Sequence, residues 1–196
     1  MHNDSPERGR FWKRLSVGAS LFLAACDGNA APSSAPRAGA ATNAPSIANQ
    51  AASDFIARAV GDDLFEYQAA QVASVRANDP AVKAFANLTA KQSADSRQAL
   101  VRSITESGQN LTAPTGLPDH LQSLLDELKR GTARDFDKTY IEQQIEVGED
   151  ALSLMSAYGR DGAIPTIRAA ASALGPARQA QLDQARSIQD TLNKVL

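Results

Sequence analysis

The chain has 196 residues, which is room for one globular domain of ordinary size and little more. Its 20 basic and 22 acidic residues nearly balance, and aromatic residues make up only 5%. With no basic excess and few aromatic side chains to stack on bases, we expect no binding to nucleic acid. One cysteine and two histidines exclude an internal disulfide framework, a cysteine-based zinc site and a multi-histidine metal centre.

The first 25 residues have the layout of a secretory signal peptide. Residues 8–14 (RGRFWKR) carry four basic side chains, and the eleven residues 15–25 carry no charge. As a helix, the uncharged run rises about 16 Å, roughly half of what a membrane-spanning helix needs. We therefore predict a signal peptide at 1–25 and no stable membrane span.

The uncharged run ends in Leu23-Ala24-Ala25-Cys26, which resembles the lipobox of bacterial lipoproteins. In that class a peptidase cuts before the cysteine, which then carries the lipid, and several acyl chains anchor a protein stably. The resemblance implies lipidation of Cys26 and a place on the periplasmic side of the bacterial cell envelope, at the inner or outer membrane. The alternative is an ordinary signal peptide with an accidental cysteine.

Residues 26–52 form the expected link between anchor and domain. After Cys26 they are mostly Ala, Pro, Ser, Gly and Asn, with almost no large apolar side chain. Such a segment buries too little surface to offset the entropy of ordering. We predict a flexible tether over 26–52, followed by a helical domain over 53–196.

Apolar residues in the remaining chain recur at helical spacing, and no convincing period-two alternation interrupts them. The long helices are expected at 54–77, 80–107, 134–158 and from 164 onward, with a short helix at 119–130. Ser53 and Asp79 are the expected N-caps of the first two, and Gly175-Pro176 is expected to interrupt and kink the last. Short joints between long helices predict an all-α, antiparallel four-helix bundle with a short extra helix.

Polar side chains lie on the expected inner faces of these helices. Gln92, Gln144 and Gln181 are at core spacing, and Glu66 lies beside the first helix's buried side, near further carboxylates at 62 and 63. Such a layer is typical of a metal site in a bundle or of a hydrogen-bonded amide cluster. Amides are poor metal ligands and the carboxylates come from one helix, which favours a structural layer with no metal and no cofactor.

No arrangement of residues indicates catalysis. The glycines are scattered through linker and turns rather than gathered in a phosphate-binding loop. The sequence shows no motif that pairs a serine nucleophile with His120 as an imidazole base, and the one cysteine is assigned to lipid. We therefore expect no enzymatic activity and assign no catalytic residue.

Four pieces of the domain carry a family resemblance: LFEYQAAQVA, DPAVKAFANL, FDKTYIEQQI and ALGPARQAQLDQA. In this order, between Asp54 and Leu192, they resemble the ferritin-like domain-of-unknown-function family numbered 4142, found in bacterial envelope proteins. The resemblance implies a ferritin-like bundle. The family's first-helix glutamate matches Glu66, whereas its three usual histidines correspond to Gln92, Gly148 and Gln181.

Two hypotheses follow from these observations. The favoured one is a lipid-anchored, non-enzymatic envelope domain that acts as a binding or stress-protective module. Its partners would be the membrane, through the lipid, and an envelope protein or small molecule whose identity the sequence does not reveal. The alternative is a degenerate ferritin-like metalloprotein that binds a metal through Glu66 and neighbouring carboxylates.

Overall fold

In a computed structural model, residues 46–195 are described, and all of their regular structure is helical. The helices are α1 (Ile47–Arg76), α2 (Pro80–Ser107), α3 (Asp119–Arg130), α4 (Phe136–Asp161) and α5 (Pro165–Val195). The expected signal peptide, Cys26 and most of the expected tether lie outside the described residues. Among the helices of this part, none is long and apolar enough to cross a membrane.

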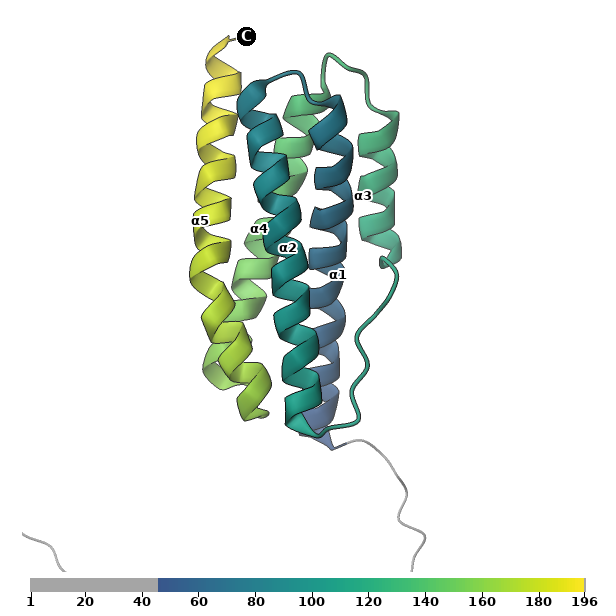
Figure 1. The fold of residues 1–196 in the computed structure, drawn as a ribbon, viewed down its shortest axis with the longest axis vertical. Coiled ribbons are helices and arrows are strands. Elements are labelled where there is room, and N and C mark those ends of the chain that lie inside the picture. Colours follow the sequence, from purple (N-terminus) through teal and green to yellow (C-terminus); the bar gives the residue numbers. More distant parts are fainter. Residues whose placement is uncertain (1–45, 196) are drawn as a thin grey trace, which may run out of the picture. The chain divides into compact units, whose positions relative to one another are not determined.

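Four long helices form the bundle, and α3 lies outside them. α1 packs against α2, α2 against α5, α5 against α4 and α4 against α1, which closes a ring around one interior. Figure 1 shows the four running side by side, with α3 along the outer edge of α1. The predicted all-α bundle with a short extra helix is confirmed.

The first helix begins earlier than predicted. Ser46 is the N-cap, and its hydroxyl oxygen accepts a hydrogen bond of 3.2 Å from the backbone N–H of Asn49. Ser53 is therefore inside α1, and residues 47–52, assigned to the tether from composition, are helical. Alanine is the best helix former, and Ala52 is fully buried, so the same residues that resemble a linker also extend a packed helix.

The turn from α1 to α2 agrees with the prediction. Asp79 caps α2 by accepting from the N–H groups of Ala81 and Val82, and Pro80 occupies the first helical turn. The Asp137 carboxylate of α4 accepts from the N–H groups of Asn78 and Asp79, which fixes this turn to the bundle. At the far end of α2, Gly108 has φ of +63°, the left-handed conformation that favours glycine.

The last helix is not interrupted. α5 runs through Pro176 without a break, although the proline removes one backbone donor. Figure 1 shows α5 changing direction along its length, as a kinked helix does. Ile167 and Ala171 before the proline, and Ala185 and Ile188 after it, are buried in the core, so packing on both sides keeps the helix intact.

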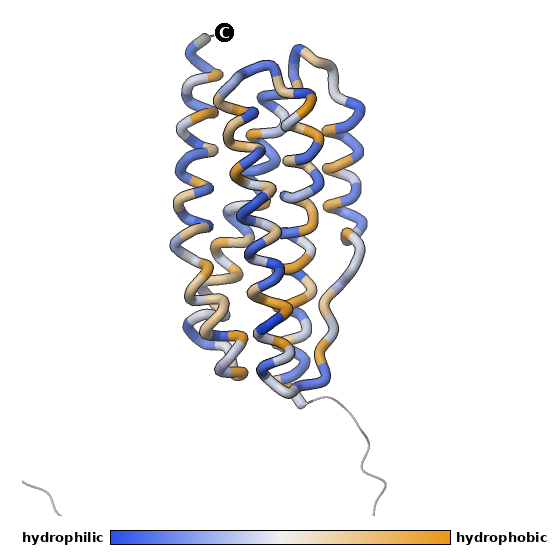
Figure 2. The backbone as a smooth tube through the Cα atoms, viewed as in Figure 1, coloured by the Kyte–Doolittle hydropathy of each residue, from blue (hydrophilic) through white to orange (hydrophobic). Residues whose placement is uncertain are grey.

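The core consists of two apolar clusters. One contains Phe65, Phe85 and Tyr140 and the other contains Phe55, Leu100 and Met155. Along α2 the two clusters are separated by buried Thr89, Ser93 and Ser96, and along α5 by Arg178 and Gln181. Figure 2 shows hydrophilic and hydrophobic residues alternating along the helices of the bundle. The polar residues between the clusters form a layer across its middle.

Candidate functional site

Three carboxylates of α1 lie in this polar layer. Asp62, Asp63 and Glu66 follow one another within about one turn of α1, and all three are buried. Glu66 is completely inaccessible to solvent. The sequence pattern placed these residues beside the buried face, whereas the structure places them inside the bundle.

An arginine from α5 binds two of these carboxylates. The guanidinium of Arg178, only 4% exposed, donates from Nη1 to Glu66 Oε2 and from Nη2 to Asp63 Oδ1. The planar fork of a guanidinium suits two acceptors at once. Longer contacts reach Gln181 Oε1 (3.4 Å) and Ser96 Oγ (3.3 Å), so α1, α2 and α5 meet at this one side chain.

A second hydrogen-bond donor to the same Glu66 oxygen comes from α2. The Ser93 hydroxyl lies 2.9 Å from Glu66 Oε2 and 2.8 Å from the backbone carbonyl of Thr89. A hydroxyl has one proton, so it donates to only one of the two at a time. When Glu66 is ionised, its charge attracts that proton, because hydrogen bonds to ionised acceptors are the stronger ones.

The buried cluster has fewer cations than carboxylates. With all three carboxylates ionised, one guanidinium would leave two negative charges uncompensated in the interior. Burial raises the pKa of Glu66 from 4.5 to about 7, and raises that of Asp62 from 3.8 to about 6 against the attraction of Arg178. Burial also lowers the pKa of Arg178 to about 10, which leaves it cationic at neutral pH. The raised pKa values favour protonation of these two carboxyls, which reduces the negative charge that Arg178 has to balance.

The four predicted layer residues do not all meet. Glu66 and Gln181 lie together at Arg178, as described. Gln144 is buried on α4, but neither end of its amide has a hydrogen-bond partner among the described residues. Gln92 is half-buried on α2 and lies beside Arg178 in the wall of a cleft. A continuous amide layer across four helices is therefore not formed.

The reason for the separation lies in the position of Gln144 on its helix. It follows Tyr140 and Ile141 and precedes Val147, all members of the apolar cluster around Phe85. On the side of Glu66 that faces this cluster, the Tyr140 hydroxyl and Thr89 Oγ1 are also without partners among residues 46–195. The side-chain polar atoms of Tyr140, Thr89 and Gln144 are therefore buried in apolar packing and form no hydrogen bond with the ionic cluster.

Sequence reasoning missed Arg178 and Ser93. Arg178 is one turn before the predicted Gln181, and Ser93 directly follows the predicted Gln92. A signal for the arginine was present, because three carboxylates on a buried face require a cation, and Arg178 is on the inner face of α5. Its long polar side chain made it resemble a surface residue.

Gly148 does not lie open to this site. A Cβ at this position would have one neighbour within 4 Å outside its own helix turn, Leu182 Cδ1 of α5, at 3.5 Å. The position where the family resemblance expects a histidine therefore contacts an apolar side chain. His120, the one histidine among the described residues, is exposed near the start of α3.

A metal fits poorly between these residues. Among the described residues, no group of three or more His, Cys, Asp or Glu side chains is placed to hold a metal ion. The guanidinium of Arg178 lies between the Asp63 and Glu66 carboxylates and binds both. A cation at that point would have to displace an arginine that already supplies the positive charge.

A narrow cleft leads to Arg178 from outside. Its volume is about 200 Å³, and it lies between α2 and α5. Gln92, Ser96, Arg178 and Gln181 line its floor and walls, together with the exposed Asp95. The cleft therefore reaches the side chain of Arg178, whereas Asp63 and Glu66 behind it are buried.

A family comparison covers most of the chain. The model of the family described as Domain of unknown function (DUF4142) matches residues 36–188, more than three quarters of the sequence. No curated protein and no solved structure matches it. The matched region includes all of α1 to α4 and the part of α5 that carries Arg178 and Gln181. The chain therefore belongs to the DUF4142 family.

Proposed function

We propose that this DUF4142 protein is a lipid-anchored domain of the bacterial cell envelope, held on the periplasmic side through acyl chains on Cys26. In this role it binds a partner or protects the envelope under stress, and it does not catalyse a reaction. The support for the anchor is the Leu23–Cys26 pattern after a short uncharged run. We also infer a ferritin-like bundle, and the arrangement of four long helices around a polar layer supports this.

The observation that carries the non-catalytic role is the pairing of Arg178 with Asp63 and Glu66. Acid–base chemistry needs a carboxyl that reaches a substrate, whereas these two are fully or almost fully buried and bound by one guanidinium. A layer whose charge is held by its own side chains stabilises and aligns helices. Binding of a partner then falls to the outer surface of the bundle.

The alternative is a metal-binding protein that uses Glu66 and neighbouring carboxylates. It is favoured by the surplus of carboxylates over cations in the layer and by Glu66 Oε1 and Asp63 Oδ2, which lack partners among the described residues. A metal would then have to enter through the cleft and move Arg178 aside. The metal content of the purified full chain distinguishes the metal-binding function from the non-catalytic one.

The anchor is tested by replacing its lipid-bearing residue. Cells expressing the full chain are labelled with a radioactive fatty acid, and the chain is compared with Cys26→Ala and, as a matched control, Ser33→Ala. We expect the fatty-acid label and processing to be lost in Cys26→Ala and unchanged in Ser33→Ala. A Cys26→Ala chain that is still cut before residue 26 would contradict the lipoprotein function.

A further inference from the structure

A second hollow lies at the end of the bundle where α1 begins. It has a volume of about 650 Å³ and lies between the first turns of α1 and the last turns of α4. Its walls are mostly apolar, with side chains from both helices: Ile47, Ala51, Phe55, Leu154, Ala157 and Tyr158. We name it the terminal groove. Its size is that of a pocket for a small ligand.

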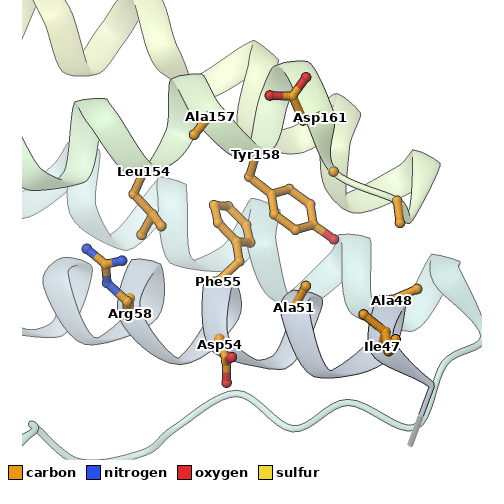
Figure 3. Close-up of a pocket in the computed structure, with 12 residues that line it drawn as sticks. Ile47, Ala48, Ala51, Asp54, Phe55, Arg58, Leu154, Ala157, Tyr158 and Asp161 are labelled. Atoms are coloured by element: carbon orange, nitrogen blue, oxygen red, sulfur yellow. The ribbon is translucent and has the colours of Figure 1, made fainter.

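Two aromatic rings fix the shape of the terminal groove. Phe55 of α1 and Tyr158 of α4 are stacked, with ring centroids 4.1 Å apart and an angle of 17° between the rings. Figure 3 shows them side by side in the middle of the groove. Gly162 packs against the Tyr158 ring, because a Cβ at this position would overlap the ring atoms. A surface that is already formed binds at a lower entropy cost.

One end of the terminal groove carries an available positive charge. Arg58 is exposed, and its charge also acts on buried Asp62, one turn further along α1, where it lowers the pKa of that carboxyl against the rise that burial causes. The two acidic residues of the rim are engaged: Asp54 accepts from Gln50 at 3.0 Å, and Asp161 from Arg160 at 3.1 Å. In Figure 3 both carboxylates point away from the space between the helices, whereas Arg58 lies beside Leu154.

We propose that the terminal groove binds a long-chain fatty acid. The carboxylate pairs with the guanidinium of Arg58, and the hydrocarbon chain lies over the partly exposed Leu154 and Tyr158 towards Ile47, with buried Phe55 behind the Tyr158 ring. A single guanidinium binds a monovalent carboxylate through two parallel hydrogen bonds. Burying the hydrocarbon chain of the fatty acid against Leu154 and Tyr158 removes apolar surface of both partners from water.

The chain's own preceding segment fits the groove less well. Residues 27–46 contain no Val, Leu, Ile, Met, Phe, Tyr or Trp, so they offer nothing of the size of the aromatic platform. Ile47, the first helical residue, is 91% exposed and already belongs to the groove's rim. The large apolar side chains of the groove therefore have no counterpart of similar size in the sequence of this segment.

Location adds a source of fatty acid, and this step rests on the proposed function. Ile47 follows Cys26 by 21 residues, so even a fully extended chain keeps the groove within about 70 Å of a lipid on that cysteine. A domain anchored in this way samples fatty acids that leave the adjacent bilayer. Binding itself depends only on the groove and Arg58.

Photolabelling of the full chain in phosphatidylcholine vesicles tests the proposal. The probe is palmitate with a diazirine on its chain, and adducts are mapped by mass spectrometry. We expect adducts within 47–58 and 154–163, displaced by palmitate at least tenfold more effectively than by uncharged hexadecanol. Arg58→Gln should lower labelling on the order of tenfold, whereas Arg130→Gln, an exposed arginine at the end of α3, should leave it unchanged.

Three results would overturn the proposal. Adducts spread over the protein, or equal displacement by hexadecanol, would show nonspecific apolar binding without recognition of the carboxylate. Labelling that falls as the protein concentration rises would show that a second copy covers the groove. Labelling that appears only in Cys26→Ala would show that the anchor's own acyl chains fill it. Equal labelling of the chain and Cys26→Ala supports the groove even if the lipid test of the anchor fails. Circular dichroism of Arg58→Gln confirms that the variant is folded.

Discussion

Arg178 is the residue on which the interior of this protein depends. A lysine offers one compact charge, whereas the guanidinium reaches Asp63, Glu66 and the side chains of Ser96 and Gln181 with separate donors. Removing one partner of a buried ion pair leaves an uncompensated charge, which costs far more than the pair itself contributes. The three carboxylates of α1 are therefore tolerated in the core because α5 supplies this cation.

The first prediction concerns the loss of that cation. Arg178→Met keeps a long side chain but removes the charge, and we expect it to lower the free energy of unfolding by about 3–5 kcal/mol at pH 7. Urea denaturation followed by circular dichroism measures the change. The control is Arg186→Met, which removes an exposed pair with Glu149 and should cost less than about 1 kcal/mol. Equal losses in the two variants would contradict the role of Arg178.

The second prediction concerns pH. The pKa of Glu66 is raised by burial from 4.5 to about 7, so the folded state binds the proton more tightly than the unfolded state. Stability should therefore be highest near and below pH 4.5 as far as this group is concerned, and should fall as pH rises to about 7, by up to about 3 kcal/mol. Asp62 acts in the same direction between its ordinary pKa of 3.8 and about 6.

Glu66→Gln isolates this contribution. The amide has the same shape and no proton to lose, so the decrease in stability between pH 5 and pH 7.5 should become smaller. Exposed Glu142→Gln is the control and should leave the pH profile of urea denaturation unchanged. A profile that is identical in the chain and in Glu66→Gln would show that Glu66 stays ionised beside Arg178 over this range.

The site was predictable only in part. Gln181 was found because helical spacing places it on an inner face, and Glu66 because it lies beside the buried side of its helix and matches the family's glutamate. Both lie at Arg178. Spacing along one helix does not fix the depth of a residue relative to the other helices, so Gln144 was grouped with them although it lies in apolar packing. Pairing across helices depends on the register of α1 against α5, which a single sequence does not encode locally.

At the scale of the elements, composition and capping gave different answers at the start of α1. The Ala-rich residues 47–52 resemble the linker before them, yet Ser46 caps a helix that includes them. Proline gave the opposite difficulty in α5, where the sequence predicted an interruption and the helix continues. In both cases burial of residues on either side of the expected boundary decides the outcome, because tertiary packing overrides local propensity.

The third prediction tests the start of α1. Ser46→Ala removes the side-chain acceptor for the Asn49 N–H, and we expect a loss of about 1 kcal/mol in the local stability of the first turns. Ser53→Ala is the control, since Ser53 is inside the helix and alanine is the better helix former. Amide hydrogen exchange at residues 49–52 measures the difference. Faster exchange in Ser53→Ala than in Ser46→Ala would restore the later start.

At the scale of the whole molecule, the number and order of the helices followed from apolar spacing, and the bounds of α2 followed from Asp79, Pro80 and Gly108. The order in which the long helices pack around the interior was not predictable in the same way, because it depends on side chains brought together from different helices. The result is two apolar clusters separated by a polar layer, with the cation of that layer coming from the last helix.

The metal content of the full chain tests this account most directly. The full chain is purified without chelator, and iron, manganese and zinc are measured per chain by elemental analysis. Because Arg178 already occupies the position between Asp63 and Glu66, we predict less than one tenth of an equivalent, on the order of adventitious binding, and a melting temperature that chelator leaves unchanged. Near-equimolar metal that disappears in Glu66→Ala would contradict the account and establish the metalloprotein instead.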